Sequence, residues 1–198
     1  MHTYTIPSFA SKVHFYTELP TQYRFAWVAE DLMHGRLQSA LGANNQQEWP
    51  HFSQQGWVLE VARFEALSRL EDTIGRWTQR ICGEQQTIEL VVNNFSGTPS
   101  QTLFARILDQ APLKKLVAQL RKLDQYLTGN GQQPLTAVNR FSLTIAEDVH
   151  TAGFENLLYR LGRVEFTEKI QVKKLLLQKR EKQHWKTVRQ FYFSEQTC

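Results

Sequence analysis

Short apolar runs in this chain alternate with longer stretches in which apolar residues recur every three or four positions. The runs predict buried strands over residues 23–29, 57–62, 87–92, 102–107, 140–146, 170–178 and 185–193. The helical spacing predicts amphipathic helices over residues 32–41, 64–81, 112–127 and 154–161. Many of the predicted strands are hairpin neighbours, so the pattern favours an α+β fold over a doubly wound α/β fold.

Loop-forming residues divide this pattern into two parts. Gly129, Gly131 and Pro134 end the third predicted helix and indicate a loop between two lobes. Shorter turns at residues 96–100 and 179–183 join strands into hairpins. We therefore expect residues 1–198 to form one bilobal domain, in which residues 1–20 are an irregular N-terminal extension.

Length and composition narrow the class of protein. The 198 residues, 41% of them hydrophobic, are enough for one domain with a buried core. No apolar run approaches the roughly 20 residues that span a bilayer, so we expect no membrane association and a cytoplasmic location. Cys82 and Cys198 have no metal-ligand spacing, and the sequence predicts neither a metal site nor a cofactor.

Positive charge is concentrated near the C-terminus, although the net charge of the chain is only +4. Lys173, Lys174, Lys179 and Arg180 lie in a predicted strand and turn, and they are the candidate surface for nucleic acid. The alternative is a solvated surface without a binding role, because most charge clusters only form a hydrated face of the protein.

Two short stretches carry the candidate chemistry: His51-Phe52-Ser53 and Ser142-Leu143-Thr144. Side chains at i and i+2 of a strand point to the same face, so each stretch would present two polar side chains together. The chain has no Gly-rich phosphate loop, Gly-x-Ser-x-Gly elbow or His-Glu-x-x-His helix.

Residues 50–53 and residues 141–146, which contain these two stretches, resemble the His-x-Ser/Thr signatures of the two-histidine phosphodiesterases. This family is also called the 2′-5′ RNA ligase-like superfamily. Residues 94–99 and 185–191 are also similar to that family's sequences. The resemblance implies a bilobal α+β fold, with antiparallel sheets of two pseudo-symmetric lobes facing a central cleft and helices outside.

The resemblance also implies roles for single residues. In that family one imidazole acts as general base, the opposite one protonates the leaving oxygen, and the two hydroxyls bind the phosphate. His51 then becomes a catalytic acid–base group, and Ser53, Ser142 and Thr144 become phosphate-binding residues. Ser142 stands where the second histidine is expected, and a hydroxyl does not exchange a proton near neutral pH. Acid–base assistance contributes about 10²–10⁴-fold in rate, so we expect little turnover.

Two questions stay open at this level. In a second register the family strand occupies residues 57–62, and His51 then belongs to a loop before it. The leading function is binding of a phosphorylated ligand, a nucleotide or RNA end, with weak or no phosphodiesterase activity. One alternative is an active phosphodiesterase that cleaves a 2′,3′-cyclic or 2′-5′ linkage through His51. Another is a non-catalytic protein-interaction module.

Overall fold

The computed structural model describes residues 18–29, 57–147, 149 and 151–194. Its strands are β1 (Thr21–Val28), β2 (Val58–Ala66), β3 (Ile88–Gly97), β4 (Leu103–Ile107), β5 (Thr136–Ala137), β6 (Ser142–Ala146), β7 (Thr167–Val172), β8 (Lys174–Glu181) and β9 (His184–Tyr192). Its helices are α2 (Glu71–Gly83), α3 (Ala111–Leu120), α4 (Asp124–Thr128) and α5 (Thr151–Leu161).

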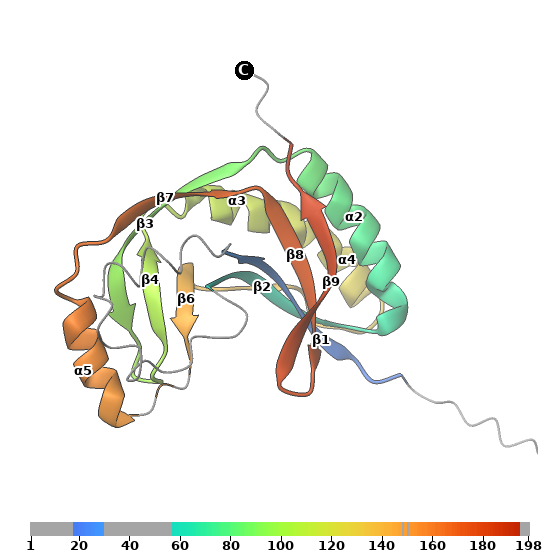
Figure 1. The fold of residues 1–198 in the computed structure, drawn as a ribbon. Helices are drawn as coiled ribbons and strands as arrows, with labels where there is room; N and C mark the ends of the chain where they lie inside the picture. The colour runs from blue at the N-terminus through green and yellow to red at the C-terminus, as the bar shows by residue number, and fades with distance from the viewer. Residues whose placement is uncertain (1–17, 30–56, 148, 150, 195–198) are drawn as a thin grey trace, which may run out of the picture.

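The described strands form one nine-stranded sheet in the order β7-β3-β4-β6-β2-β1-β8-β9, with β5 beside β2. Neighbouring strands of this order are antiparallel. Figure 1 shows β7, β3, β4 and β6 on the left and β2, β1, β8 and β9 on the right, and we call these the left and right halves. The halves join at a seam of two residue pairs, Val58 with Thr144 and Leu59 with Leu143. The predicted α+β class is confirmed, but the two lobes share one continuous sheet.

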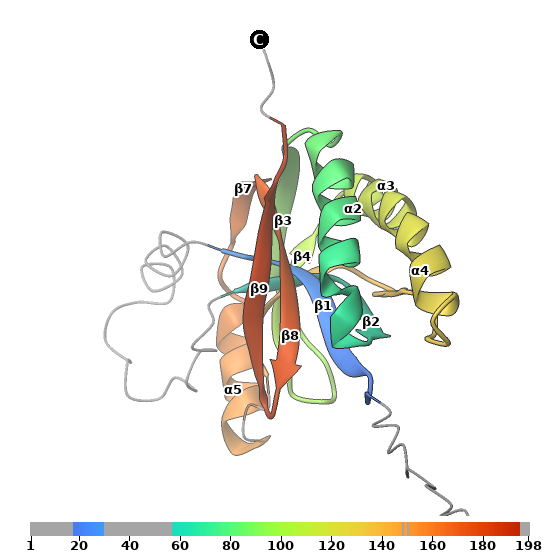
Figure 2. The ribbon, with the colours of Figure 1, turned by 90° about the vertical axis from the view of Figure 1, so that its right-hand side faces the viewer.

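Helices pack on both halves. Helix α2 packs on β9 and β8, α3 on β2, and α5 on β3. In Figure 2 α2, α3 and α4 lie together on one side of the sheet. In the core of the right half, the rings of Tyr23 and Phe25 of β1 pack against the ring of Phe64 of β2, at centroid distances of 5.5 and 5.3 Å. Phe95 and Phe166 form a similar pair at 4.8 Å beneath the left half.

The predicted strand over residues 170–178 is wrong as a single strand. It divides at Lys173 into β7, which pairs with β3, and β8, which pairs with β1 and β9. In Figure 1 the chain crosses over the top of the molecule from the left half to the right half at this point. The backbone N–H of Phe193 donates to the Lys173 carbonyl at 2.8 Å and holds the crossing. The apolar pattern runs through the break because both strands bury residues close to it.

Two predicted helices also differ from the observed ones. The helix expected from residue 64 begins at Glu71, because Phe64 still belongs to β2 and pairs with Tyr23 of β1. The helix expected over residues 112–127 consists of α3, a short 3-10 turn at Arg121–Leu123, and α4. The helix predicted over residues 32–41 lies outside the described residues.

Candidate functional site

Strand β6 places Ser142 and Thr144 on one face of the sheet, as their i, i+2 spacing predicts. Both side chains are half-buried, whereas Leu143 and Ile145 between and beside them are fully buried on the opposite face. We call the face that carries Ser142 and Thr144 the polar face. It lies at the seam, where the two halves of the sheet meet.

Strand β4 adds a cation to this pair of hydroxyls. Arg106 pairs with Ser142 and Phe104 pairs with Thr144, and directly paired residues point to the same side of a sheet. Arg106 is exposed, and its guanidinium approaches the Ser96 hydroxyl at 3.5 Å. Among the described residues it forms no ion pair. A guanidinium beside two hydroxyls is a donor set that suits a phosphate or carboxylate.

The start of β6 is held by Gln110, the residue before α3. The Gln110 side-chain amide donates to the Phe141 carbonyl at 3.3 Å, and its oxygen accepts from the Phe141 N–H at 3.3 Å. The neighbouring Asp109 carboxylate accepts from the Ala111 N–H at 2.9 Å and fixes the first turn of α3. These bonds define the backbone position immediately before Ser142.

The right half of the polar face carries a buried arginine. Two residues beyond Val58, Glu60 lies on the polar face, and its carboxylate is 3.6 Å from a terminal nitrogen of Arg24. Arg24 Nε donates to the Gln178 side chain at 2.7 Å, and Arg63 donates to Glu60 at 2.8 Å. Burial lowers the pKa of Arg24 to about 10 against the opposing effect of Glu60, so Arg24 is charged at neutral pH.

Trp185 of β9 lies among these side chains. The guanidinium carbons of Arg24, Arg180 and Arg63 are 4.4, 5.2 and 5.9 Å from the centroid of its ring. We call Trp185 with these three arginines the Trp185 cluster. The sequence pattern does not show that these arginines gather around Trp185, although Arg24 stands out as a single charge inside an apolar strand.

The strand that pairs with β6 is β2, which favours the second register considered from the sequence. On the polar face β2 presents Val58 and Glu60 at the seam. His51 and Ser53 lie outside the described residues, so their roles stay predictions. Of the six histidines of the chain, His184 alone belongs to the described part, and it is exposed beside the β8–β9 turn.

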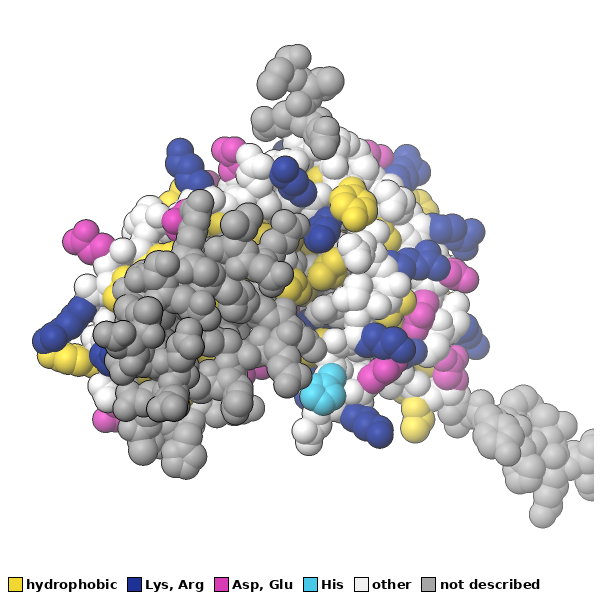
Figure 3. All heavy atoms as spheres, in the orientation of Figure 1, with side chains coloured by type: hydrophobic (Ala, Val, Ile, Leu, Met, Phe, Trp, Pro, Cys, Tyr) yellow, Lys and Arg dark blue, Asp and Glu magenta, His cyan; other side chains and the backbone are white. Residues whose placement is uncertain are grey.

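The predicted basic residues do not share one surface. Lys179 lies on the side of α2, where its ammonium is 2.9 Å from the Glu71 carboxylate and 3.1 Å from the Ser68 hydroxyl. Arg180, the next residue, lies on the polar face, and Lys173 and Lys174 lie at the opposite end of β8. Figure 3 shows basic and acidic side chains intermingled over the right part of the molecule, without one continuous basic patch.

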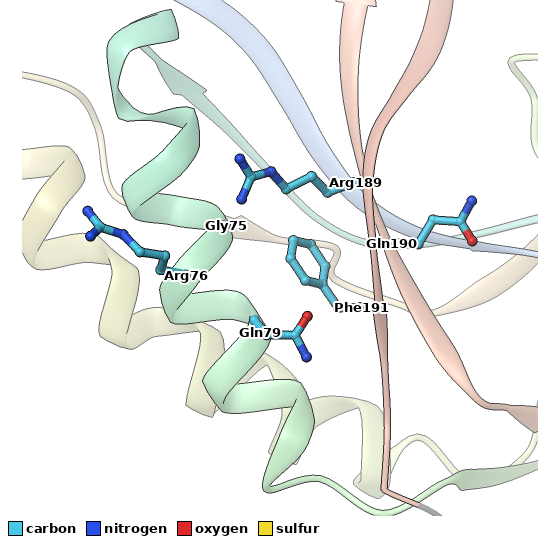
Figure 4. Close-up of a pocket in the computed structure, with 6 residues that line it drawn as sticks. All are labelled: Gly75, Arg76, Gln79, Arg189, Gln190 and Phe191. Carbon is cyan, nitrogen blue, oxygen red and sulfur yellow. The ribbon is translucent and has the colours of Figure 1, made fainter.

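A groove of about 350 Å³ lies between α2 and β9, on the side of the sheet away from the polar face. Figure 4 shows Arg189 extending over Gly75 and the Phe191 ring directed toward α2. A Cβ at Gly75 would lie 2.5 Å from the Arg189 guanidinium, so glycine permits this close approach. Arg189 also pairs with Asp72 of α2. The groove therefore belongs to the attachment of the β8–β9 hairpin to α2.

Comparison with known proteins places this geometry in a known fold. No protein-family model matches the chain, and no curated protein matches it. The structure of E. coli LigT complexed with 3′-AMP matches with 14% identity and a TM-score of 0.63, over 89% of this chain and 99% of LigT. The chain has the LigT fold. A structure described as a phosphoesterase matches with 13% identity and a TM-score of 0.61, over 89% of this chain and 99% of that chain.

A protein of Thermus thermophilus has the same LigT fold, with 13% identity and a TM-score of 0.60, over 89% of this chain and all of the other. The likeness to these structures covers both halves of the sheet, because nine-tenths of the chain aligns. No helix among the described residues is long and apolar enough to cross a membrane.

Proposed function

We propose that this protein binds a phosphorylated ligand, a nucleotide or RNA end, on its polar face and has weak or no phosphodiesterase activity. The observation that carries the proposal is the adjacency of Arg106, Ser142 and Thr144 on two paired strands. The exposed guanidinium supplies charge and the two half-buried hydroxyls supply hydrogen bonds to phosphate oxygens.

The LigT fold supports the same ligand class. The structures of E. coli LigT include complexes with 3′-AMP, phosphate, ATP and NADP+. Each of these ligands carries phosphate, and the polar face of this chain offers the donors that phosphate requires. We infer a ligand of this kind, without a preference for a particular base.

Weak turnover follows from the side chains at the seam. A serine occupies the position on β6 where the resemblance to the two-histidine phosphodiesterases expects an imidazole, and the paired strand β2 presents Val58 and Glu60. Loss of one member of an acid–base pair removes about 10²–10⁴-fold in rate. The expected activity on 2′,3′-cyclic phosphodiesters is therefore negligible.

Calorimetric titration with inorganic phosphate and with 3′-AMP at low salt tests the binding. We expect Arg106→Gln and Thr144→Val to weaken 3′-AMP binding by about tenfold, because each removes a donor to the phosphate. Arg121→Gln, on the turn between α3 and α4, is the matched control and should bind like the parent protein. Absence of binding to both ligands, or equal affinity in every variant, would overturn the proposal and favour the interaction module.

A hydrolysis assay with 2′,3′-cyclic nucleotides tests the second half of the proposal. Negligible turnover is the expected result. Robust turnover that disappears in His51→Ala would show an active phosphodiesterase in which His51 serves as acid or base.

A further inference from the structure

Strand β9 forms one edge of the sheet, and part of its outer side is open. It is the last strand of the order and pairs only with β8 among the described strands. The Phe193 N–H donates to the Lys173 carbonyl next to β8. Successive residues of a strand direct their backbone groups to opposite sides. The N–H and C=O groups of Gln190 and Tyr192 therefore face outward, where no described strand pairs with them.

The open stretch has a defined end on each side. Beyond its upper end, the Ser194 N–H donates to the Gln85 carbonyl at 2.8 Å, and the Ser194 carbonyl accepts from the Thr87 N–H at 3.2 Å. At its lower end, Val188 has no partner in the β8–β9 register, and a bulge of this kind interrupts regular pairing. The open edge is therefore a short segment, residues 189–192.

The groove between α2 and β9 lies beside this open edge. Figure 2 views the sheet from this edge and shows α2 and β9 next to each other. Gln190 lines the groove, although Figure 4 shows its side chain directed away from α2 and those of Arg189 and Phe191 on the side of α2. The backbone of Gln190 therefore borders the groove. A strand that paired with Gln190 would direct every second side chain toward α2.

The groove offers hydrogen-bond donors and positive charge. The Gln79 side chain is exposed, points toward β9 in Figure 4 and has no hydrogen bond among the described residues. Arg189 donates to Asp72 through one terminal nitrogen, which leaves other N–H groups of its guanidinium available. Strand β9 contains His184, Lys186 and Arg189 but no Asp or Glu. Carboxylates on the α2 side of an added strand would complement these groups.

We propose that the open edge of β9 and the α2–β9 groove bind an extended acidic segment of a partner protein, which adds a short strand to the sheet. In this mode of recognition, backbone hydrogen bonds supply affinity and the pockets for alternate side chains supply specificity. A second copy of β9 is disfavoured as the occupant, because two basic strands without carboxylates would lie together. The groove lies away from the polar face, so this inference does not depend on the proposed function.

Fluorescence anisotropy with a short labelled peptide of alternating glutamate and valine tests the proposal. We expect binding that weakens as salt rises, and no binding when lysine replaces glutamate. Two N-methylated forms of the peptide distinguish strand pairing from attraction between charges alone. Methylation of the alternate residues whose N–H groups face β9 should abolish binding, and methylation of the other set should not.

Two pairs of variants locate the site on the protein. Gln190→Pro removes an outward N–H and should weaken binding about tenfold, while the bonds to β8 remain. Gln171→Pro is the matched control on β7, the opposite edge, because the Phe166 carbonyl bonds to the Asn94 N–H and the Gln171 N–H therefore points outward.

Gln79→Glu tests the groove with an exposed helical side chain, so the protein should fold normally. It should weaken binding about threefold to tenfold, because it places a carboxylate opposite those of the peptide. Gln125→Glu on α4 makes the same change outside the groove and should bind like the parent protein. Amide hydrogen exchange gives a direct readout, because the Gln190 and Tyr192 N–H groups should exchange more slowly in the complex.

Four outcomes would overturn the proposal. The first is no binding of the peptide up to about 1 mM, which would show an edge that is only protected by its charges. The second is binding that both methylated peptides retain, or that Gln190→Pro and Gln79→Glu leave unchanged. The third is a dimer in sedimentation that Gln190→Pro dissociates, which would assign the edge to a second copy. The fourth is competition by a 3′-phosphorylated RNA, which would indicate a general surface for polyanions.

Discussion

The two halves of the sheet have the same number of strands in the main order but different chemistry on the polar face. The left half presents Ser142, Thr144 and Arg106, whose guanidinium has no carboxylate partner among the described residues. In the right half, Arg24 and Arg63 are already bonded to Glu60 and Gln178. Polar side chains without strong partners in the protein can bind a ligand, whereas side chains that already bond to other residues mainly stabilise the fold.

The attachment of the helices shows the same contrast. The right half holds α2 by the ion pairs Glu71–Lys179 and Asp72–Arg189. In the left half, Phe154 of α5 packs against Gly97 of β3, where a Cβ would lie 2.6 Å from the ring. Ion pairs therefore add to the apolar packing of Ile74 and Ile81 that holds α2 on the right, whereas close apolar packing holds α5 on the left.

The largest expected effect comes from the seam that joins the halves. Leu143 is fully buried and pairs with Leu59, so Leu143→Ala should lower the free energy of unfolding by about 2–5 kcal/mol. Ser142→Ala, at the neighbouring position, removes a half-buried hydroxyl and should change the free energy of unfolding by less than about 1 kcal/mol. Urea unfolding followed by tryptophan fluorescence and by circular dichroism measures both. Two separate transitions in Leu143→Ala would show that the halves unfold independently.

The second effect contrasts one arginine from each half. Arg24→Met leaves Gln178 without its donor and Glu60 with one partner, so we expect a loss of stability of about 1–3 kcal/mol. Arg106→Gln alters an exposed side chain and should cost less than about 0.5 kcal/mol while weakening phosphate binding. The same urea experiment measures both values. Equal losses of stability in the two variants would contradict the view that Arg24 stabilises the fold whereas Arg106 is available to a ligand.

The third effect is a pH dependence of the stability that Glu71 contributes in the right half. Burial raises the pKa of Glu71, but hydrogen bonds from Lys179 and Tyr23 outweigh it, so the pKa is lowered overall. Ionised Glu71 therefore stabilises the fold above the pKa it has when unfolded, and this contribution is lost as pH falls through the lower, folded value. The stability difference between the parent and Glu71→Gln, about 1 kcal/mol at neutral pH, should shrink in acid. Glu155→Gln on α5 is the control for the loss of an exposed carboxylate.

The smallest expected effect concerns the basic residues at the crossing between the halves. Charge reversal of Lys173 and Lys174 should weaken oligonucleotide binding modestly and flatten its salt dependence, by about one unit of slope per lost phosphate contact. The adjacent pair Lys114 and Lys115 on α3, reversed in the same way, is the control and should leave the slope unchanged. Thr144→Val should reduce affinity with little change in slope. Identical slopes in all variants would exclude Lys173 and Lys174 from the site.

Local patterns in the sequence predict much of the fold, and contacts between distant residues account for the rest. The alternation over residues 140–146 correctly predicts that Ser142 and Thr144 share a face, because a strand has a period of two. The run over residues 170–178 does not reveal the change of half at Lys173, because both strands bury apolar residues close to the break, Ile170 and Val172 before it and Leu175 to Leu177 after it. The Trp185 cluster depends on contacts between residues far apart in the chain, such as the hydrogen bond between Arg24 and Gln178, which are 154 positions apart. No local pattern of the sequence encodes such contacts. The Lys179–Glu71 pair was missed for the same reason.

The crossing at Lys173 also sets an order for folding. The left half consists of strands between Ile88 and Val172, so its partners are synthesised close together. The right half combines β1 and β2 with β8, and Tyr23 pairs with Lys179. During synthesis, the edge of β1 that pairs with β8 therefore stays unpaired until most of the chain has been made. Non-local strand pairings of this kind form slowly. We expect the left half to acquire protection from hydrogen exchange first during refolding, and the edge of β1 to be the segment most exposed to misassociation until β8 arrives.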